Sequence, residues 1–372
     1  MKKTFPKLTQ GILAMLLCVV TFTACSTPDI PKLLEQGKTA FYKANYSEAK
    51  NAFKECADAG DSQGQYWLAF TTTKINGHYS ETDTLAMSKE EINKYCYDLF
   101  KKSADQNDGD GYYGLALCYG NGHGVAQDKN KYTEYLDKSV ELNSTFGKAW
   151  KGHYLTQKGG NENIQKGIAL IKESADAGNY EGKCLLGAYY LDGLGVEKNI
   201  DKGLELLQES ASHNDYMANS ILAKVYFFGK ESIKANRAEA FKYAKKGSND
   251  GVTAYIASMC YWDGNGTEKN EKLSATYACA SANHGFAPGQ SWWAAFCENG
   301  YGTEEEAFGW YKKAADQGEI NGMVGVGEFL LTGKAGKTDY ATAKRYLKKA
   351  ASMGSQNAQE LLSRYQWELS NY

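Results

Sequence analysis

Apolar residues recur along most of the chain at the spacing of one helical face, between positions held by small or polar residues. The pattern repeats with a period of about 36 residues, interrupted by one interval of 47. A fixed period of this length predicts an array of stacked helix pairs, each burying its apolar face only against its neighbours. Each period closes on a Gly or Asn, at Gly60, Asn107, Asn143, Gly178, Asn214, Asn249, Gly285, Gly318 and Gly354.

Small residues occupy fixed columns after these closing positions. Four residues later the chain carries mostly glycine, and nine residues later every residue is small. A glycine inside a helix costs about 1 kcal/mol relative to alanine, so its repetition in one column requires a geometric reason. We expect neighbouring helices to approach closely at this column. Its glycines are Gly64, Gly111, Gly147, Gly182, Gly289 and Gly322.

Together these columns resemble the Sel-one-like repeat (SLR) family. The resemblance is fullest at Leu186-Gly187, Tyr190, Gly193, Gly195-Val196 and Ser210-Ala211. It implies an all-α fold, a right-handed α-solenoid superhelix of antiparallel helix pairs, related to tetratricopeptide repeats. Proteins of this family often act as adaptors for other proteins.

The resemblance also divides the chain. The solenoid is expected over residues 37–354, with a tetratricopeptide-like first segment at 37–60 and an insertion at 71–94. A long insertion in a solenoid sometimes binds a partner and sometimes is an inert surface loop, and the sequence does not distinguish these two interpretations here. Residues 355–372 are expected to form a C-terminal capping helix, because a repeat array needs a polar outer face at its end.

The N-terminus has the pattern of an export signal. Lys2, Lys3 and Lys7 precede the uncharged apolar stretch 11–22, which is too short for a membrane span. The segment Phe22-Thr23-Ala24-Cys25 resembles the lipobox of bacterial lipoproteins. That resemblance implies a signal peptide over 1–24, acylation of Cys25 and a short tether over 25–36. Ordinary cleavage after Ala24, leaving Cys25 free, is the alternative.

The same resemblance implies a place in the cell. Ser26 follows the cysteine where an inner-membrane retention signal would favour Asp, so the expected localisation is the cell envelope, with a lipid anchor in the outer membrane. Removal of residues 1–24 leaves 39 basic and 44 acidic side chains. A mildly acidic protein has no electrostatic attraction for a phosphate backbone, so nucleic acid is not an expected partner.

No motif in the chain indicates catalysis, a metal or a cofactor. The seven cysteines after Cys25 contain no CxxC pair, the five histidines lack ligand spacing, and the glycine-rich turns lack the phosphate-loop pattern. Cys260 and Cys279, with Cys297 nearby, are candidates for a disulfide, and unlinked buried thiols are the alternative. We therefore expect a protein that is not an enzyme.

Aromatic residues are the remaining signal. A column containing Trp67, Trp150 and Trp292 also holds Leu185, Ile221 and Ile256, which predicts a core position. Neighbouring columns mix tyrosine with lysine and glutamine, which indicates either a solvated face able to bind a partner or ordinary helix packing. The candidate partner-binding face consists of Tyr66, Tyr112, Tyr113, Lys148, Lys183, Tyr255 and Gln290.

Two hypotheses about function follow. The first is a membrane-anchored, non-catalytic scaffold or adaptor of the bacterial cell envelope that binds other proteins. The alternative is a periplasmic binder of cell-wall fragments or glycans, with or without weak hydrolase activity. The residues alone do not identify the partner.

Overall fold

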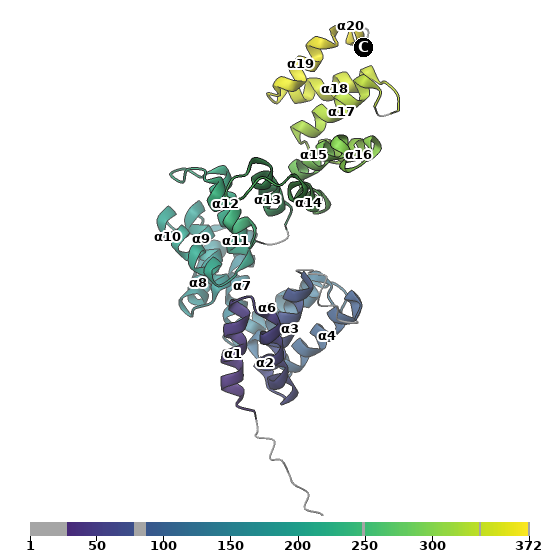
Figure 1. The fold of residues 1–372 in the computed structure, drawn as a ribbon. Coiled ribbons are helices and arrows are strands. Elements are labelled where there is room, and N and C mark those ends of the chain that lie inside the picture. Colours follow the sequence, from purple (N-terminus) through teal and green to yellow (C-terminus); the bar gives the residue numbers. More distant parts are fainter. Residues whose placement is uncertain (1–27, 78–86, 248–249, 335, 371–372) are drawn as a thin grey trace, which may run out of the picture.

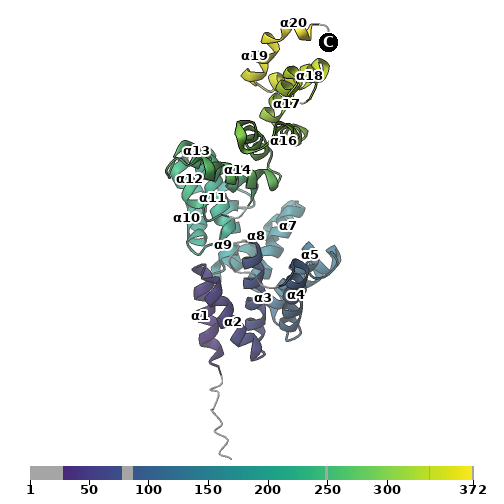
Figure 2. The ribbon, with the colours of Figure 1, turned by 45° about the vertical axis from the view of Figure 1, so that its right-hand side comes forward.

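The chain folds as an elongated α-solenoid. The structure, a computed structural model, describes residues 28–77, 87–247, 250–334 and 336–370. Figure 1 shows helix pairs stacked from the N-terminal end at the bottom to the C-terminal end at the top, and the turned view of Figure 2 shows the same order. In these ranges the regular structure is helical, apart from one isolated bridge between Lys230 and Ile233. The predicted all-α class and repeat architecture are confirmed.

Each repeat contributes two antiparallel helices, an odd-numbered one followed by an even-numbered one. The bounds are α1 (Ile30–Tyr42), α2 (Tyr46–Asp58), α3 (Ser62–Gly77), α4 (Lys89–Ala104), α5 (Gly109–Asn121), α6 (Lys129–Glu141), α7 (Thr145–Lys158), α8 (Asn161–Asp176), α9 (Tyr180–Asp192), α10 (Ile200–Ser212), α11 (Tyr216–Phe228), α12 (Arg237–Ala244), α13 (Gly251–Asp263), α14 (Glu271–Asn283), α15 (Ala287–Phe296), η1 (Cys297–Tyr301), α16 (Glu304–Asp316), α17 (Ile320–Thr332), α18 (Tyr340–Ser352), α19 (Gln356–Arg364) and α20 (Gln366–Leu369).

The odd-numbered helices form a continuous row. Each one from α1 to α17 contacts the next odd-numbered helix, and each even-numbered helix from α2 to α18 packs between the two odd-numbered helices that flank it in sequence. One side of every repeat therefore contributes to the same surface along the array. This row carries the candidate site described below.

The closing positions act as helix terminators. Every one that the structure describes has positive φ, from 57° at Asn214 to 95° at Gly354, and Asn249 lies outside the described residues. Glycine adopts this left-handed conformation freely, and asparagine tolerates it better than most residues. At Gly178 the N–H donates back to the carbonyl of Ala175, and the next N–H donates to that of Ser174. This turn ends one helix and sends the chain into the next repeat.

The glycine column marks close helix contacts, as predicted. A Cβ added at Gly182 would lie 2.4 Å from Ser174 Oγ and 2.9 Å from the backbone nitrogen of Ala175. At Gly147 the corresponding distance to Ser139 Oγ is 2.1 Å. Ser174 also donates to the carbonyl of Thr145, at the start of the preceding odd-numbered helix, at 2.7 Å. Ser210 and Ser281 donate in the same way to the carbonyls of Tyr180 and Gly251. The same two columns therefore join adjacent repeats and the two helices within one repeat.

The N-terminal end of the array differs from the prediction. Helix α1 begins at Ile30, so the helical array reaches into the segment 25–36, for which the sequence predicts a tether. The predicted signal peptide and Cys25 lie outside the described residues.

The predicted insertion at 71–94 is partly helical. The end of α3 and the start of α4 occupy much of it, and residues 78–86 lie outside the described residues. No described helix is long and apolar enough to cross a membrane.

The C-terminal cap consists of two short helices rather than one. The backbone leaves helical geometry at Tyr365, where φ is −102° and ψ is 26°. This break turns α20 back toward α18, so that Leu369 is buried and its carbonyl accepts a hydrogen bond from Lys344 Nζ at 2.9 Å. The last repeat is covered by this return.

We expect Gly182→Ala to lower the free energy of unfolding by about 1–3 kcal/mol, because the added methyl group overlaps Ser174 and backbone atoms. Gly309→Ala is the matched control: it lies inside α16 with no atom within 4 Å of an added Cβ. Its helix propensity should raise stability by about 0.5–1 kcal/mol. Urea denaturation followed by circular dichroism measures both. If both substitutions change the free energy of unfolding equally, close contact between helices is not the reason why glycine recurs at this position.

Candidate functional site

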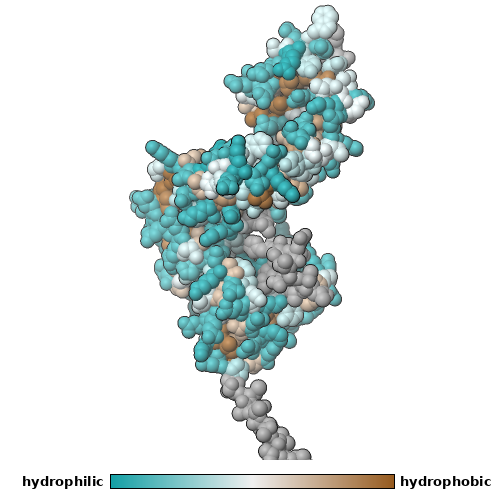
Figure 3. All heavy atoms as spheres, viewed as in Figure 1, coloured by the Kyte–Doolittle hydropathy of each residue, from teal (hydrophilic) through white to brown (hydrophobic). Residues whose placement is uncertain are grey.

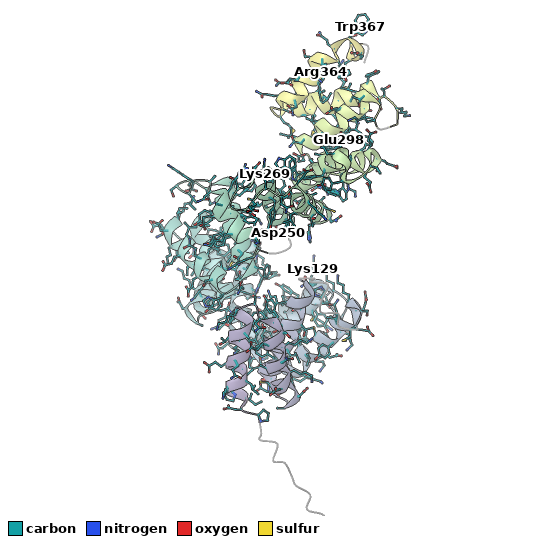
Figure 4. All side chains as sticks on the ribbon, in the orientation of Figure 1. Lys129, Asp250, Lys269, Glu298, Arg364 and Trp367 are labelled. Atoms are coloured by element: carbon teal, nitrogen blue, oxygen red, sulfur yellow. The ribbon has the colours of Figure 1, made fainter. Side chains whose placement is uncertain are left out.

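A concave groove of about 1200 Å³ runs along the row of odd-numbered helices in the first half of the array. Lys129 and Asp250 both line it, and Figure 4 labels them on the lower and middle parts of the molecule. The visible face in Figure 3 is mostly hydrophilic, with small scattered hydrophobic areas. The aromatic residues that line the groove are Phe70, Phe100, Tyr113, Tyr132, Trp150, Tyr154 and Tyr216.

A small recess opens at the inner end of this groove. The recess has a volume of about 30 Å³, enough for one or two water molecules. Four residues, Phe70, Lys74, Glu181 and Tyr216, line both the recess and the groove, so the two spaces adjoin. The side chains of these four residues therefore form the boundary between the groove and the recess.

One wall of the recess is formed by a contact between distant repeats. Asn214 Nδ2 donates to the carbonyl of Tyr42 at 2.7 Å, although 172 residues separate them. The ring of Tyr42 meets the edge of Tyr180 at 4.8 Å between centroids, and Tyr180 stacks on His213 at 3.9 Å. In Figures 1 and 2 the C-terminal end of α1 lies beside the α8–α9 region. The first repeats thus curve until α1 touches the turns before α9 and α11.

The recess holds two carboxylates and one ammonium group, from Glu181, Asp215 and Lys74. Glu181 is buried and accepts a hydrogen bond from Trp150 Nε1 at 2.5 Å. Lys74 Nζ lies over the ring of Tyr216, 4.1 Å from its centroid. Among the described residues the Lys74 ammonium forms no ion pair. The recess therefore combines a net negative charge with aromatic walls.

Asp215 titrates far from its usual range. Burial, and secondarily the negative charge of Glu181, raises the pKa of Asp215 to about 6, against the pull of Lys74 and of its own hydrogen bond from the backbone of Ala218. Burial lowers the pKa of Lys74, which the charges of Glu181 and Asp215 partly offset. Both directions arise because these charges face protein atoms where a free side chain would face water.

Local helix capping positions Asp215. The residue precedes the first turn of α11 and its side chain accepts from the N–H of Ala218 at 2.7 Å. The corresponding position caps the odd-numbered helices of the two preceding repeats with Asn179 and Ser144. The cap thus requires an acceptor oxygen but no charge.

The predicted partner-binding face does not form one surface. Tyr66, Tyr113 and Gln290 are buried, with 0%, 2% and 5% of their surface exposed, so their assignment to a solvated face is wrong. The columns that hold them face adjacent helices: the ring of Tyr66, for example, packs against Phe100 of α4 and Phe146 of α7. Of the seven predicted residues, Tyr113 alone lines the groove.

The other predicted residues are half-buried and separate from one another. Tyr112 packs on Tyr135, and Tyr255 packs on Phe286. Lys148 pairs with Glu173 at 3.0 Å, and Lys183 pairs with Glu209 at 2.5 Å. These contacts give each residue a structural role within its repeat. Their binding role stays a prediction.

Apart from Tyr113, the residues that line the groove were not among those predicted to bind a partner. Trp150 belongs to the column predicted as core; Trp67 in that column is buried, whereas Trp150 and Trp292 are half-buried and Trp150 lines the groove. Phe146, Trp150 and Tyr154 are spaced four apart along α7, which places them on one helical face. That row of large aromatic residues was the feature of the sequence that could have indicated the groove.

Other chemistry is sparse. Within the described residues no group of His, Cys, Asp or Glu side chains has the arrangement of a metal site. The seven cysteines described are free thiols, including Cys260 and Cys279, and all except Cys279 are buried. Burial raises the pKa of Cys96 and of Cys118 to about 12, which keeps both protonated and unreactive at neutral pH.

We expect Asp215→Asn to stabilise the fold at neutral pH. The pKa of Asp215 is about 6 in the folded protein and 3.8 in the free side chain. Below pH 4 the carboxyl is protonated in both states and does not lower the free energy of unfolding. As the pH rises through 6 the buried carboxyl loses its proton, and the free energy of unfolding falls. The asparagine variant keeps the helix cap and should gain up to about 3 kcal/mol at pH 7 and about half that at pH 5.

Asp339→Asn is the matched control for this substitution. Asp339 also caps a helix, but the backbone hydrogen bond from Thr342 lowers its pKa, so its removal should not stabilise the fold at pH 7. Denaturation of both variants between pH 4 and 8 tests the expectation. A gain for Asp215→Asn that does not change with pH would contradict it.

Comparison with known proteins agrees with this architecture. The model of the Sel1 repeat matches residues 109–144, 152–179, 181–215, 217–252, 253–286, 287–319 and 320–355. The structure is similar to that of a protective antigen with an SLR fold from uropathogenic Escherichia coli strains, at 24% identity and TM-score 0.54, covering 90% of this chain and 72% of that one.

A second similar structure is a Sel1 repeat protein from Oxalobacter formigenes, at 20% identity and TM-score 0.48, covering 84% of this chain and 89% of that one. No match was found among curated proteins. The seven matched repeats begin at α5 and continue to the turn before α19, in register with the helix pairs described above. The chain belongs to the Sel1 repeat family.

Proposed function

We propose that the protein is a membrane-tethered scaffold of the bacterial cell envelope, which binds a segment of a partner protein in its groove. Sel1 repeats generally mediate binding to other proteins. The observation that supports this site is the aromatic groove of about 1200 Å³ on the row of odd-numbered helices. Tyrosine and tryptophan in a concave surface are the residues that most often dominate the energy of protein interfaces.

The dimensions of the groove favour an extended segment over a compact ligand. Typical small-molecule pockets have volumes of about 300–1,000 Å³ and enclose their ligand. Here the lining residues come from helices α3 to α7 and from as far along the array as Asp250 and His284. A peptide in such a groove would contact several repeats at once, which is how a solenoid uses its concave surface.

The proposed anchor fits the start of the array. Helix α1 begins at Ile30, five residues after Cys25. Five extended residues span at most roughly 18 Å, so an acylated Cys25 would hold the first repeats close to the lipid surface. The first repeats would then lie within reach of partners at the same membrane.

Binding of cell-wall fragments or glycans is a second candidate. The groove combines aromatic faces, such as Trp150 and Tyr154, with the side-chain amides of Asn93 and Gln127. Flat apolar faces beside amide donors and acceptors also suit a sugar ring. The same experiment distinguishes the two candidates.

The experiment is affinity purification of the tagged protein from its own host, with crosslinking before solubilisation. Under the scaffold proposal one protein recurs, and the double variant Tyr154→Ala with Lys129→Glu reduces its recovery at least tenfold. The matched control Tyr301→Ala with Lys269→Glu changes the same residue types on the exposed surface and should leave recovery unchanged. Recovery of sugars or muropeptides without a protein would favour the second candidate and contradict the first.

The anchor has its own test. We expect Cys25→Ser to abolish incorporation of labelled palmitate and to release the protein from the membrane fraction into the soluble fraction. Cys279→Ser, which removes a half-buried thiol elsewhere, should change neither. A Cys25→Ser protein that stays with the membrane would show that another part of the molecule holds it there.

A further inference from the structure

The recess at the inner end of the groove has more negative than positive charge. Glu181 and Asp215 line it together with Lys74. The carboxylates lie close enough for Glu181 to perturb the titration of Asp215. Lys74 contributes one positive charge, but its ammonium lies over the rings of Tyr216 and Phe70 and forms no ion pair among the described residues. One negative charge therefore remains uncompensated in a poorly solvated space.

The fold does not require this charge. Asn179 and Ser144 perform the same capping role as Asp215 with neutral side chains. Two interacting carboxylates in a concave site reduce stability at neutral pH, and such arrangements cluster where a protein binds or reacts. The placement of Asp215 beside Glu181 is therefore better explained by a ligand than by the helix cap.

The walls and size of the recess define the ligand group. Tyr42, Tyr180 and Tyr216 surround it, and aromatic faces attract cations that have left water. A volume of about 30 Å³ accepts an ammonium group but excludes a ring. The opening into the groove requires that this group sits at the end of a flexible chain.

We propose that the recess binds the side-chain ammonium of a lysine in the partner segment, with the carboxylates of Glu181 and Asp215 as its acceptors. This inference rests on the proposed function, because the segment lies in the groove. An ammonium has three N–H donors and no acceptor, which suits two carboxylates better than any neutral polar group does. Trp150 orients Glu181 through its indole N–H, and the cap orients Asp215.

The test uses the full-length chain in detergent and four fluorescently labelled peptides. They are Ac-Leu-Ala-Lys-Ala-Leu-NH₂ and its analogues with norleucine, acetyl-lysine or glutamate at the central position. In fluorescence anisotropy the lysine peptide should bind at least about tenfold more tightly than the other three, because each lacks the cation. In a spectrum of the ¹⁵N-labelled tryptophans, the indole N–H of Trp150 should shift with the lysine peptide and not with the norleucine peptide.

Charge variants locate the effect. Asp215→Asn and Glu181→Gln should remove the preference for lysine, whereas the matched control Asp339→Asn should retain it. Lys74→Met removes the cation that competes for the same carboxylates and should tighten binding of the lysine peptide. Because Asp215→Asn keeps its cap and is expected to be more stable than the wild type, a loss of binding cannot be attributed to unfolding.

Three outcomes would overturn the inference. If all four peptides bind equally and Tyr154→Ala with Lys129→Glu weakens them all, the groove binds peptides but the recess does not select lysine. If the glutamate peptide is preferred and Lys74→Met abolishes this, the recess is a carboxylate site. If no peptide binds, the lysine site is wrong, while recovery of a partner by crosslinking still decides the proposed function separately.

Discussion

The array depends on the contact between a glycine at the start of most odd-numbered helices and a small residue near the end of the helix before it. At Gly182 and Gly147 no space remains for a methyl group, and the facing serines are fully buried. The contact fixes the distance between repeats, and the left-handed residue just before it fixes their angle. Since both recur with the same period, the odd-numbered helices form one curved row, and the groove is a consequence of this curvature.

Within this regular frame the charged recess is an exception. Most ion pairs in the described part of the chain connect neighbouring turns or neighbouring repeats at the surface, as Lys230 and Asp192 do. Surface pairs of this kind contribute little to stability. Glu181, Asp215 and Lys74 come from three different repeats and are held among aromatic rings, where their charges interact strongly. The regular contacts explain the fold, and the irregular charges distinguish one place within it.

The period, the helix-terminating residues and the close helix contacts could be predicted from the sequence, because each requires particular residue types that recur at the same position of most repeats. Gly178 and Gly182 could be recognised since their equivalents stand at the same distances in other repeats. The binding face was harder to predict from the sequence. Adjacent residues on a helix point in directions about 100° apart, so an error of one residue in the alignment of the repeats exchanges a surface position for a core position. Tyr112 and Tyr113 illustrate this: one is half-buried against Tyr135 and the other lies in the core and lines the groove.

The contact between Tyr42 and Asn214 also has a consequence for how the molecule is made. Repeat arrays fold mainly through local contacts, and each unit can form soon after it is synthesised. The recess cannot form early, because Asn214, the hydrogen-bond partner of Tyr42, is synthesised about 170 residues after Tyr42. During synthesis the early repeats therefore hold an incomplete recess. Under the proposed function, a partner segment could bind the recess only after the fifth and sixth helix pairs have joined the first, so binding would begin only when this half of the chain is complete.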